Sequence, residues 1–227
     1  MQSIQSQVFK DFEVWIVDGN SSGEMQAYLK TLLPPFNFIS EQDRGIYDAM
    51  NKGISQSKGE WLFFLGSADV FFDTDVLANV FSSIKEEHSL VSGNIRYHGN
   101  TRPFVYSKHK TIKKPIWSSM IWLWNGLHHQ GTFYRKTLFS EILYNLKYKI
   151  LSDYWLHLSL FKKKIPCEIL EIVITTCNSD GISKKGHWKM YQEEISLKTN
   201  LSSVYLAPVF YMFSLIKYAF KKIINES

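Results

Sequence analysis

The sequence predicts an α/β domain with a mostly parallel sheet and helices on both of its faces. Apolar and amphipathic runs alternate between residues 12 and 84, and this strand–helix order implies parallel strands joined by crossover helices. The run "EWLFFLG" at 60–66 is apolar at its centre, which is typical of a strand buried on both faces. With 227 residues, of which 45% are hydrophobic, the chain can form one such domain with a sizeable core.

The individual elements follow from local signals along the chain. A buried strand closes on Asp18-Gly19, a serine then caps a helix, and Pro34-Pro35 ends that helix. The next helix repeats apolar residues on one face from Ile46 to Ile54. The aromatic stretch at 111–134 has no clear period, and long ordered loops of this kind often carry function. In order, we predict strands at 12–18, 36–40 and 60–66 with helices at 23–33, 46–58 and 74–84, then two strands around a Gly99-Asn100 turn, a helix at 152–164 capped by Ser152, a strand at 167–176, a loop at 178–188 and a final helical region.

Charge and cysteine content limit the kinds of partner. The net charge is +5 and the sequence pI is about 9.0, which fits an anionic partner such as a phosphorylated small molecule or an anionic membrane. The basic residues are not interleaved with aromatic ones as in a nucleic-acid groove, so we expect no nucleic acid.

Cys167 and Cys177 bracket an apolar run that, when extended, holds them beyond disulfide reach. Because the first residues also contain no apolar signal-peptide core, we expect a reduced, cytoplasmic protein.

Two carboxylates stand at the ends of predicted parallel strands. Asp18 ends the first strand and Asp69 follows the third. Ligands of parallel sheets bind at the carboxyl ends of the strands. Acidic residues at two such ends therefore favour a site for a metal ion and a nucleotide.

The motifs around these residues resemble one family. The run "EVWIVDGNSS…ISEQDRGIYDAMNKGISQSKGEWLFFLGSAD" resembles a family-2 glycosyltransferase of the GT-A fold. The later motifs "HHQGTFYRKTLF", "LSDYWLHLSLF" and "SDGIS" follow in the order of the branch that builds bacterial O-antigens and other surface polysaccharides. The resemblance implies a glycosyltransferase domain over residues 1–190, which transfers a sugar with inversion from a nucleotide-diphosphate sugar to a glycan or lipid-linked acceptor.

The resemblance also implies a divalent cation. Sugar transfer leaves a diphosphate with new negative charge, which Mg²⁺ or Mn²⁺ can neutralise when a carboxylate holds the ion. In the "SAD" of residues 67–69, Asp69 aligns with the family's metal ligand, and Ala68 stands where an Asp that touches the ribose is common. From the residues alone, Asp69 fits a turn after a strand equally well. The nearby acidic pair in "DTD" at 73–75 is interpreted as a helix cap.

Four residues are implied on the nucleotide side of the site. Asp18 aligns with the Asp that accepts hydrogen bonds from the base or ribose, whereas Gly23 replaces the second acid of the family's Asp-Gly-x-Ser-x-Asp motif. Asp43, Arg44 and Asp48 are weaker candidates. A basic side chain is expected beside a diphosphate, but charges in a solvated turn are equally expected.

Asp153 is implied as the general base. An inverting transferase needs a carboxylate that takes the proton from the acceptor hydroxyl. An acid in the first turn of a helix is also stabilised by the helix dipole, so a structural Asp153 is the alternative. His129 and Gln130 match the family's His-Gln pair and are implied on the acceptor side, although a His in an aromatic stretch can equally be a core residue.

The C-terminal segment at 191–227 is predicted to be helical and membrane-associated. No residue from Thr199 to Ile216 is charged, and Lys217, Lys221 and Lys222 follow. Polar residues interrupt the stretch, so a helix lying on the cytoplasmic face of the inner membrane is favoured over a membrane span. The alternatives are a helix packed on its own domain and a peripheral membrane scaffold.

The chain departs from the family at its start. The family usually begins with a further strand whose loop helps to bind the nucleotide base, whereas "SIQSQVFKDFE" matches the end of the helix after that strand. We therefore expect a missing strand and an unpaired sheet edge. Together with Ala68 and Gly23, this departure supports a rival interpretation: a catalytically inactive remnant that only binds a nucleotide, a membrane or a partner.

Overall fold

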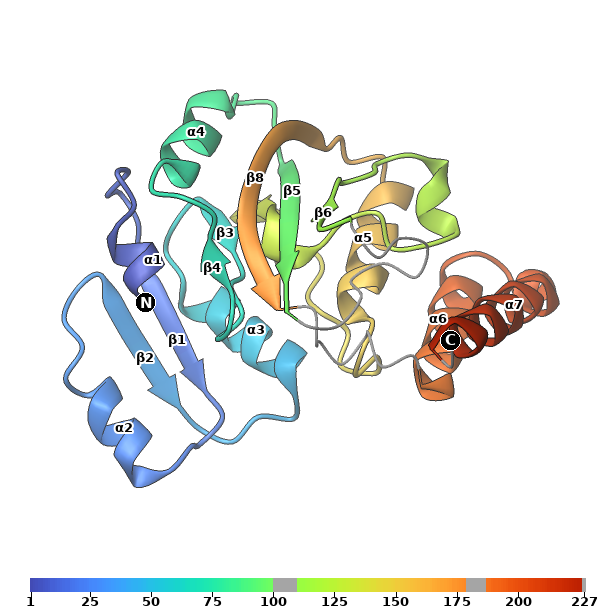
Figure 1. Cartoon of the computed structure of the whole chain (residues 1–227), viewed down its shortest axis with the longest axis horizontal. Coiled ribbons are helices and arrows are strands. Elements are labelled where there is room, and N and C mark those ends of the chain that lie inside the picture. Colours follow the sequence, from blue (N-terminus) through green and yellow to red (C-terminus); the bar gives the residue numbers. More distant parts are fainter. Residues whose placement is uncertain (100–109, 179–186, 226–227) are drawn as a thin grey trace.

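The computed structural model describes residues 1–99, 110–178 and 187–225. A six-stranded sheet lies at the centre, with a two-stranded sheet at one end of the molecule and two helices at the other (Figure 1). The strands are β1 (Val14–Asp18), β2 (Phe36–Ser40), β3 (Trp61–Phe63), β4 (Val70–Phe71), β5 (Leu90–His98), β6 (Ile112–Lys113), β7 (Thr132–Arg135) and β8 (Glu168–Asn178). The α-helices are α1 (Gln2–Gln5), α2 (Gly23–Leu29), α3 (Ile46–Gln56), α4 (Val76–Ser83), α5 (Ser152–Lys162), α6 (Trp188–Leu201) and α7 (Ala207–Asn225). Short 3-10 segments are η1 (Ser119–Trp122), η2 (His129–Gly131), η3 (Lys136–Ser140) and η5 (Val204–Leu206).

The first sheet contains only β1 and β2. They pair in parallel, with Val14 opposite Phe36 and Asp18 opposite Ser40. In the described part of the chain, no strand pairing joins this sheet to the larger one. The alternation of strands and helices was interpreted as one sheet, and the structure divides it into two.

The six-stranded sheet has mixed pairing. Its order is β3-β7-β5-β8-β4, with β6 added to β5; β5 and β8 run parallel and the other pairs run antiparallel. The α/β class is confirmed, whereas the mostly parallel pairing is not. The reason is that β7 follows an irregular segment instead of a crossover helix, so it is free to return antiparallel. The prediction that "EWLFFLG" forms a central strand is also wrong. Among the described strands, β3 lies at an edge of the sheet, with β7 as its partner.

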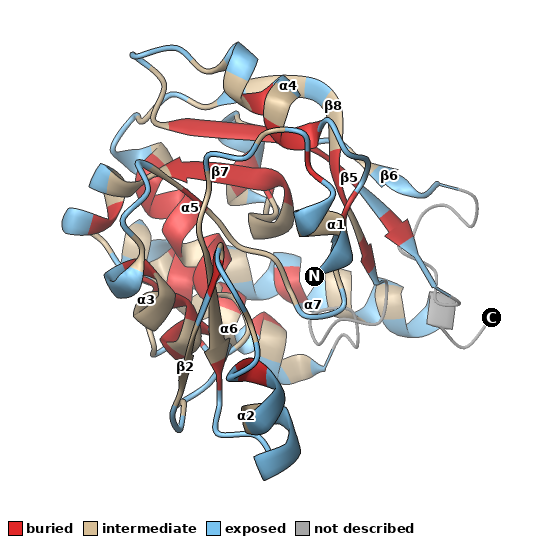
Figure 2. Ribbon diagram, turned by 90° about the vertical axis from the view of Figure 1, so that its left-hand side faces the viewer, coloured by how far each residue is buried: buried red, intermediate tan, exposed pale blue. Residues whose placement is uncertain are grey.

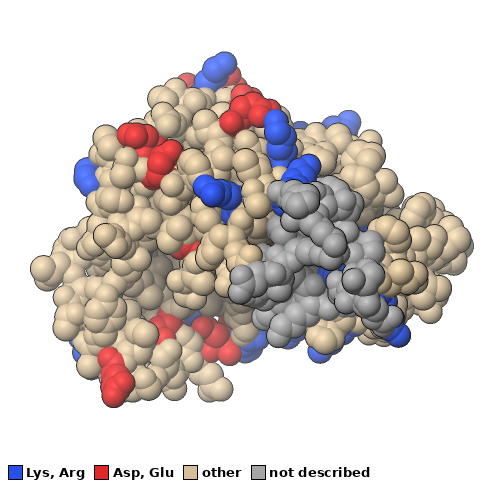
Figure 3. All heavy atoms as spheres, in the orientation of Figure 1, with Lys and Arg blue, Asp and Glu red and all other residues tan. Residues whose placement is uncertain are grey.

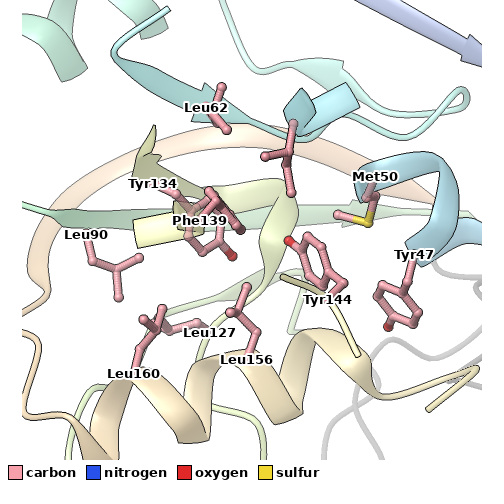
Figure 4. Close-up of a cluster of buried hydrophobic side chains, with 11 residues drawn as sticks. Tyr47, Met50, Leu62, Leu90, Leu127, Tyr134, Phe139, Tyr144, Leu156 and Leu160 are labelled. Carbon is pink, nitrogen blue, oxygen red and sulfur yellow. The ribbon is translucent and has the colours of Figure 1, made fainter. Parts of the chain in front are cut away.

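The core lies on both faces of this sheet. Successive residues of a strand point to opposite faces. Leu90 and Tyr134 therefore join one cluster with α3 and α5 (Figure 4), while Val91 and Phe133 join another with α4. Burial differs between helices: α5 is buried along much of its length, whereas α2 is largely exposed (Figure 2). Helices on both faces are thus confirmed.

Local expectations met different outcomes. α5 begins at Ser152, but Leu151 occupies its N-cap position, so the capping role of Ser152 is wrong. The backbone reaches a helical conformation at Ser152, one residue earlier than a Ser152 cap would require. Asp75 does stand at the N-cap position of α4, although its side chain makes no capping hydrogen bond. Cys167 and Cys177, both within the described residues, do not form a disulfide bond, as predicted. Asn100 of the expected turn, most of the expected loop and the "SDGIS" motif lie outside the described residues.

Candidate active site

Asp153 lies in the first turn of α5, surrounded by hydrogen-bond donors. Its Oδ1 accepts from the backbone N–H of Tyr154 at 2.8 Å and lies 3.0 Å from the hydroxyl of Tyr47, which shares its one proton with the carbonyl of Ile150 at 2.8 Å. Its Oδ2 accepts from Asn125 Nδ2 at 3.2 Å. His129 Nδ1 lies 3.6 Å from the same Oδ2, within ion-pair range but too far for a hydrogen bond. Three hydrogen-bond donors and one imidazole thus converge on this carboxylate.

This carboxylate is ionised although it is nearly buried. The Asp153 side chain keeps 12% of its exposure. Burial alone raises the pKa of a carboxyl group, but the imidazole of His129 and the N–H of Tyr154 hold the pKa of Asp153 below its usual value. The adjacent His157 is neutral at pH 7, because burial lowers its pKa to about 4. Asp153 is therefore an anion with a small opening to its surroundings.

His129 and Gln130 lie in η2, directly before β7. Gly131 allows this placement, because a Cβ there would lie 2.7 Å from Ile95 Cγ2 and 3.0 Å from a backbone oxygen of β5. The carbonyl of Gln130 accepts a hydrogen bond of 2.6 Å from Thr175. His129 Nδ1 is buried and makes no hydrogen bond within the part of the chain that the structure describes. The structure therefore brings His129 to Asp153 and leaves a polar atom there without a hydrogen bond.

Asp69 lies in the turn between β3 and β4. The turn is closed by a bond of 3.0 Å from the N–H of Asp69 to the carbonyl of Gly66. The carboxylate folds back over Gly66, since a Cβ on that glycine would lie 2.6 Å from Asp69 Oδ2. Burial raises the pKa of Tyr97, and the charges of Asp69 and Asp153 both raise it further. Both carboxylates therefore lie near enough to Tyr97 to affect its pKa.

Asp18 and Asp43 lie close together at the end of β1. Asp18 Oδ2 accepts from Ser40 Oγ at 2.6 Å and from Ser21 N at 3.0 Å, and these bonds lower the pKa of Asp18. Asp43 lies beside the next residue, because a Cβ on Gly19 would be 3.2 Å from Asp43 Oδ2. Asp43 also forms an ion pair of 2.5 Å with Lys52. Two of the implied nucleotide-side residues therefore share one corner.

Arg44 and Asp48 form an ion pair at the start of α3. The guanidinium Nη2 lies 3.0 Å from Asp48 Oδ1, and the N–H of Arg44 donates to Asp48 Oδ2 at 3.0 Å. The Arg44 side chain is 75% exposed, whereas that of Asp48 is 10% exposed. Asp48 therefore stabilises the turn, and the Arg44 guanidinium stays accessible to a ligand.

The sequence motifs missed the residues that hold Asp153. Tyr47 joins α3 to α5, and its position inside "GIYDAMNKG" was the available signal. His157 lies one helical turn after Asp153, so helical spacing placed it on the same face. Asn125 comes from the irregular segment at 111–134, where no periodicity identified it.

Solved glycosyltransferase structures share this fold. S. aureus TarS 1–349, solved with UDP-GlcNAc, has a TM-score of 0.65 at 16% identity, over 88% of this chain and 60% of the TarS chain. The mannosyltransferase PcManGT from Pyrobaculum calidifontis, solved with GDP-Man and Mn²⁺, has a TM-score of 0.62 at 14% identity, over 97% of this chain and 68% of that one. The chain thus has the α/β fold of GT-A-type glycosyltransferases, as the motifs implied.

The chain belongs to glycosyl transferase family 2, whose model matches residues 1–166. A PGL/p-HBAD biosynthesis glycosyltransferase of Mycobacterium bovis is 29% identical over 210 residues, which cover 88% of this chain and 79% of the relative. An uncharacterized glycosyltransferase of Mycobacterium tuberculosis is 28% identical over 199 residues, which cover 82% of this chain and 71% of that protein. The predicted enzyme class is therefore confirmed: the chain is a glycosyltransferase. The O-antigen branch and the missing strand stay predictions.

Proposed function

We propose that this glycosyltransferase moves a sugar from a nucleotide-diphosphate sugar to a glycan or lipid-linked acceptor, with inversion and with a divalent cation, in the synthesis of a bacterial surface glycan. TarS and PcManGT were solved with UDP-GlcNAc and with GDP-Man and Mn²⁺, which supports a nucleotide-sugar donor. The mycobacterial relative is named a PGL/p-HBAD biosynthesis glycosyltransferase, which supports a role in a biosynthetic pathway.

The ionised Asp153 beside the unbonded His129 Nδ1 is the observation that carries this proposal. From the described residues, Oδ2 of Asp153 accepts one hydrogen bond, so it can also accept a proton from a hydroxyl group. An acceptor hydroxyl at this position would satisfy the buried His129 Nδ1 as well. Loss of that proton makes the acceptor oxygen a nucleophile for the anomeric carbon, and the bond to the nucleoside diphosphate breaks.

The donor class can be tested with UDP-GlcNAc and GDP-Man. We expect one of them, in the presence of Mn²⁺, to bind in calorimetric titration and to release its nucleoside diphosphate when an acceptor extract is added. The anomeric configuration of the product, read by NMR, tests inversion. Retention of configuration would contradict Asp153 as a direct base, since one displacement inverts the carbon.

The cation is part of the proposal. Among residues 1–99, 110–178 and 187–225, no three His, Cys, Asp or Glu side chains gather as a metal-binding group. Asp69 fits a cation that binds mainly through the donor's phosphates, because Mg²⁺ often uses one or two carboxylates together with phosphates and water. The described residues donate no hydrogen bond to the Asp69 carboxylate, which leaves its oxygens available. A bound ion would neutralise charge on the leaving diphosphate.

A protein that binds a nucleotide sugar without transferring it is the second candidate. The division of the fold favours this candidate. Within the described residues, no strand pairing joins the sheet of β1, which ends at Asp18, to the sheet of β3, which precedes Asp69. If the donor pocket is built from both sheets, loops and side chains alone keep its two halves together. Donor binding without release of the nucleoside diphosphate would favour this candidate.

The apolar face of α7 supports attachment to a membrane surface. The inner side of this helix contains Ser214, which is 1% exposed, and Lys217, which forms an ion pair with Glu194. The outer side is apolar, the reverse of a helix that faces water. None of the described helices combines the length and hydrophobicity that a membrane span requires. The exposed apolar residues of this face are Val209 (42%), Tyr211 (51%), Met212 (54%), Phe213 (45%), Leu215 (46%), Ile216 (57%), Phe220 (56%) and Ile223 (67%).

The lysines contribute less to this surface than the sequence indicated. Lys217 points inward to Glu194 and the carbonyl of Leu123, and Lys221 is half-buried. Lys222 remains exposed. The end of the molecule that holds α6 and α7 carries few visible charges in Figure 3. We therefore propose that α7 binds lipid mainly by burying apolar side chains, with a small electrostatic contribution.

Replacing Met212 and Ile216 together by Glu is expected to remove vesicle binding. Each side chain that enters the interface contributes about 1.5–3 kcal/mol, so binding to vesicles of phosphatidylcholine and phosphatidylglycerol should weaken by about tenfold or more. Cosedimentation measures this loss. Met25→Glu with Tyr28→Glu on α2, at the opposite end of the molecule (Figure 1), is the matched control, because both residues are about half exposed. Unchanged vesicle binding together with a concentration-dependent dimer in solution would show that α7 pairs with a second copy instead.

A further inference from the structure

Asn125 connects Asp153 to a fully buried histidine. Its Nδ2 lies 3.2 Å from Asp153 Oδ2, and its Oδ1 lies 3.0 Å from His157 Nδ1. His157 Nε2 in turn lies 2.7 Å from the hydroxyl of Tyr134. His157 and Tyr134 have no exposed surface, and Tyr134 lies over α5 (Figure 4). Four polar side chains therefore form one line from the core to the candidate base.

The ionised carboxylate fixes the direction of every bond in this line. A carboxylate only accepts, so Asn125 must turn its NH₂ group toward Asp153 and its oxygen toward His157. His157 must then carry its proton on Nδ1. Since the ring is neutral, Nε2 is an acceptor, and the Tyr134 hydroxyl donates to it. One orientation satisfies all the groups at once.

We propose that Asn125 and His157 are positioning residues that make Oδ2 of Asp153 the oxygen that takes the acceptor's proton. This inference rests on the proposed function, in which Asp153 is the base. Oδ1 accepts from the N–H of Tyr154 and lies against the Tyr47 hydroxyl, whose single proton is shared with the carbonyl of Ile150. Among the described residues, Oδ2 receives one bond, from Asn125. The remaining lone pair of Oδ2 faces the side of His129. An amide group cannot relay a proton. The hydrogen bonds through Asn125 therefore position Asp153 and do not remove the proton that it takes up.

The backbone around Asn125 is also fixed. Lys113 Nζ donates to its carbonyl at 3.3 Å. The next residue is Gly126, where a Cβ would lie 2.1 Å from the carbonyl oxygen of Ile116, so the backbone passes too close for any other side chain. The N–H of Ile116 donates to Gly126 at 2.9 Å. These contacts fix the backbone from which the Asn125 amide group extends.

The network predicts a shift in the pH dependence of turnover. A base works when ionised, so activity falls as pH drops through the pKa of Asp153. Removing the Asn125 amide takes away a hydrogen bond to the charged form, which raises that pKa by about one unit. The titratable groups that face Asp153 from the packed elements, and that stay in place in this variant, are Tyr47, Tyr97, Lys113, His129, Tyr134, Tyr144 and His157.

The test compares Asn125→Ala, His157→Leu and His157→Asn. We expect Asn125→Ala to lower kcat by up to about 100-fold with little change in donor KM, because the base loses its alignment. The acid limb of kcat, and the ¹³C titration of the Asp153 carboxyl, should both move up by about one pH unit. His157→Leu should follow the same direction. His157→Asn keeps an N–H donor near the Nδ1 position, so it should restore most of the turnover.

Asn51→Ala is the matched control. Among the described residues its amide bonds only to the backbone of Tyr144, at 2.9 and 3.0 Å, so its loss should lower the melting temperature without moving the acid limb. Equal kcat losses in Asn125→Ala and Asn51→Ala, with no shift in the titration, would overturn the inference. If Asn125→Ala does not fold, identical behaviour of His157→Leu and His157→Asn would overturn it instead. An inactive wild type with a shifted titration would count against the proposed function but not against the network.

Discussion

Asp153→Asn is expected to lower turnover by about 10²–10⁴-fold while donor binding changes little. The substituted amide has nearly the same size, so the packing of α5 is retained, but it cannot take a proton from the acceptor. The loss should therefore appear in kcat. Single-turnover transfer assays together with calorimetric titration of the donor measure the two effects separately.

The charge environment of Asp153 explains why the loss should be large. Its carboxylate is nearly buried, and its pKa is nevertheless held below the usual value, so it is ionised across the physiological range. Water that replaces it as the base is far less effective in a closed site. Of the neighbouring groups, His157 is fully buried with both ring nitrogens in hydrogen bonds, and Tyr47 stays protonated because its pKa is strongly raised, so neither is an alternative base at pH 7.

Glu193→Gln is the matched control for this substitution. Glu193 accepts from the backbone N–H groups of Lys149, Ile150 and Leu151, directly before α5. Its replacement removes a charge that supports the same helix start, so it should lower stability and leave most of the turnover intact. Equal losses in Glu193→Gln and Asp153→Asn would show that Asp153 acts through the fold. Unchanged turnover in Asp153→Asn would place the base elsewhere.

Local sequence signals located most elements but not their partners. The apolar period from Ile46 to Ile54 identified α3, and the acid at the start of "SDYWLHLSLF" was placed in the first turn of α5. A strand pattern, however, carries no information on which strand lies next to it. The prediction of β3 as a central strand was therefore wrong, and the mixed pairing was not visible in the sequence.

The candidate site shows the same division between local and distant information. Asp153 and His129 stood out because each lies in a recognisable motif, and the structure brings them within 3.6 Å. Asn125 stood out in no pattern, because its role depends on a contact made across 28 residues of sequence. The position of Lys217 directly after an uncharged stretch predicts a membrane-facing charge, but the rotation of α7 about its axis turns it toward Glu194. Helix periodicity gives the faces of a helix, and packing alone decides which face is outside.

Asp69→Asn is expected to abolish the contribution of Mn²⁺ to donor binding. An amide is a weaker ligand for a hard cation than a carboxylate, and the described residues offer no second acid in a metal-binding group with Asp69. The affinity for UDP-GlcNAc or GDP-Man, whichever donor binds, should fall by about tenfold or more in Mn²⁺ and should then equal the affinity in EDTA. Calorimetric titration of wild type and variant, each with Mn²⁺ and with EDTA, measures this directly and does not depend on turnover.

Asp73→Asn separates a ligand role from a general loss of negative charge. Asp73 lies four residues further on, and its Oδ1 accepts from the N–H of Asp75 at 2.9 Å in the turn before α4, a bond that an Asn side chain can also accept. This variant should keep the full effect of Mn²⁺ on donor binding. If both variants lose it, the cation responds to the overall charge of this region and Asp69 is not a specific ligand. If neither loses it, the ion is held by other groups, and the carboxylate that folds over Gly66 serves the turn between β3 and β4 instead.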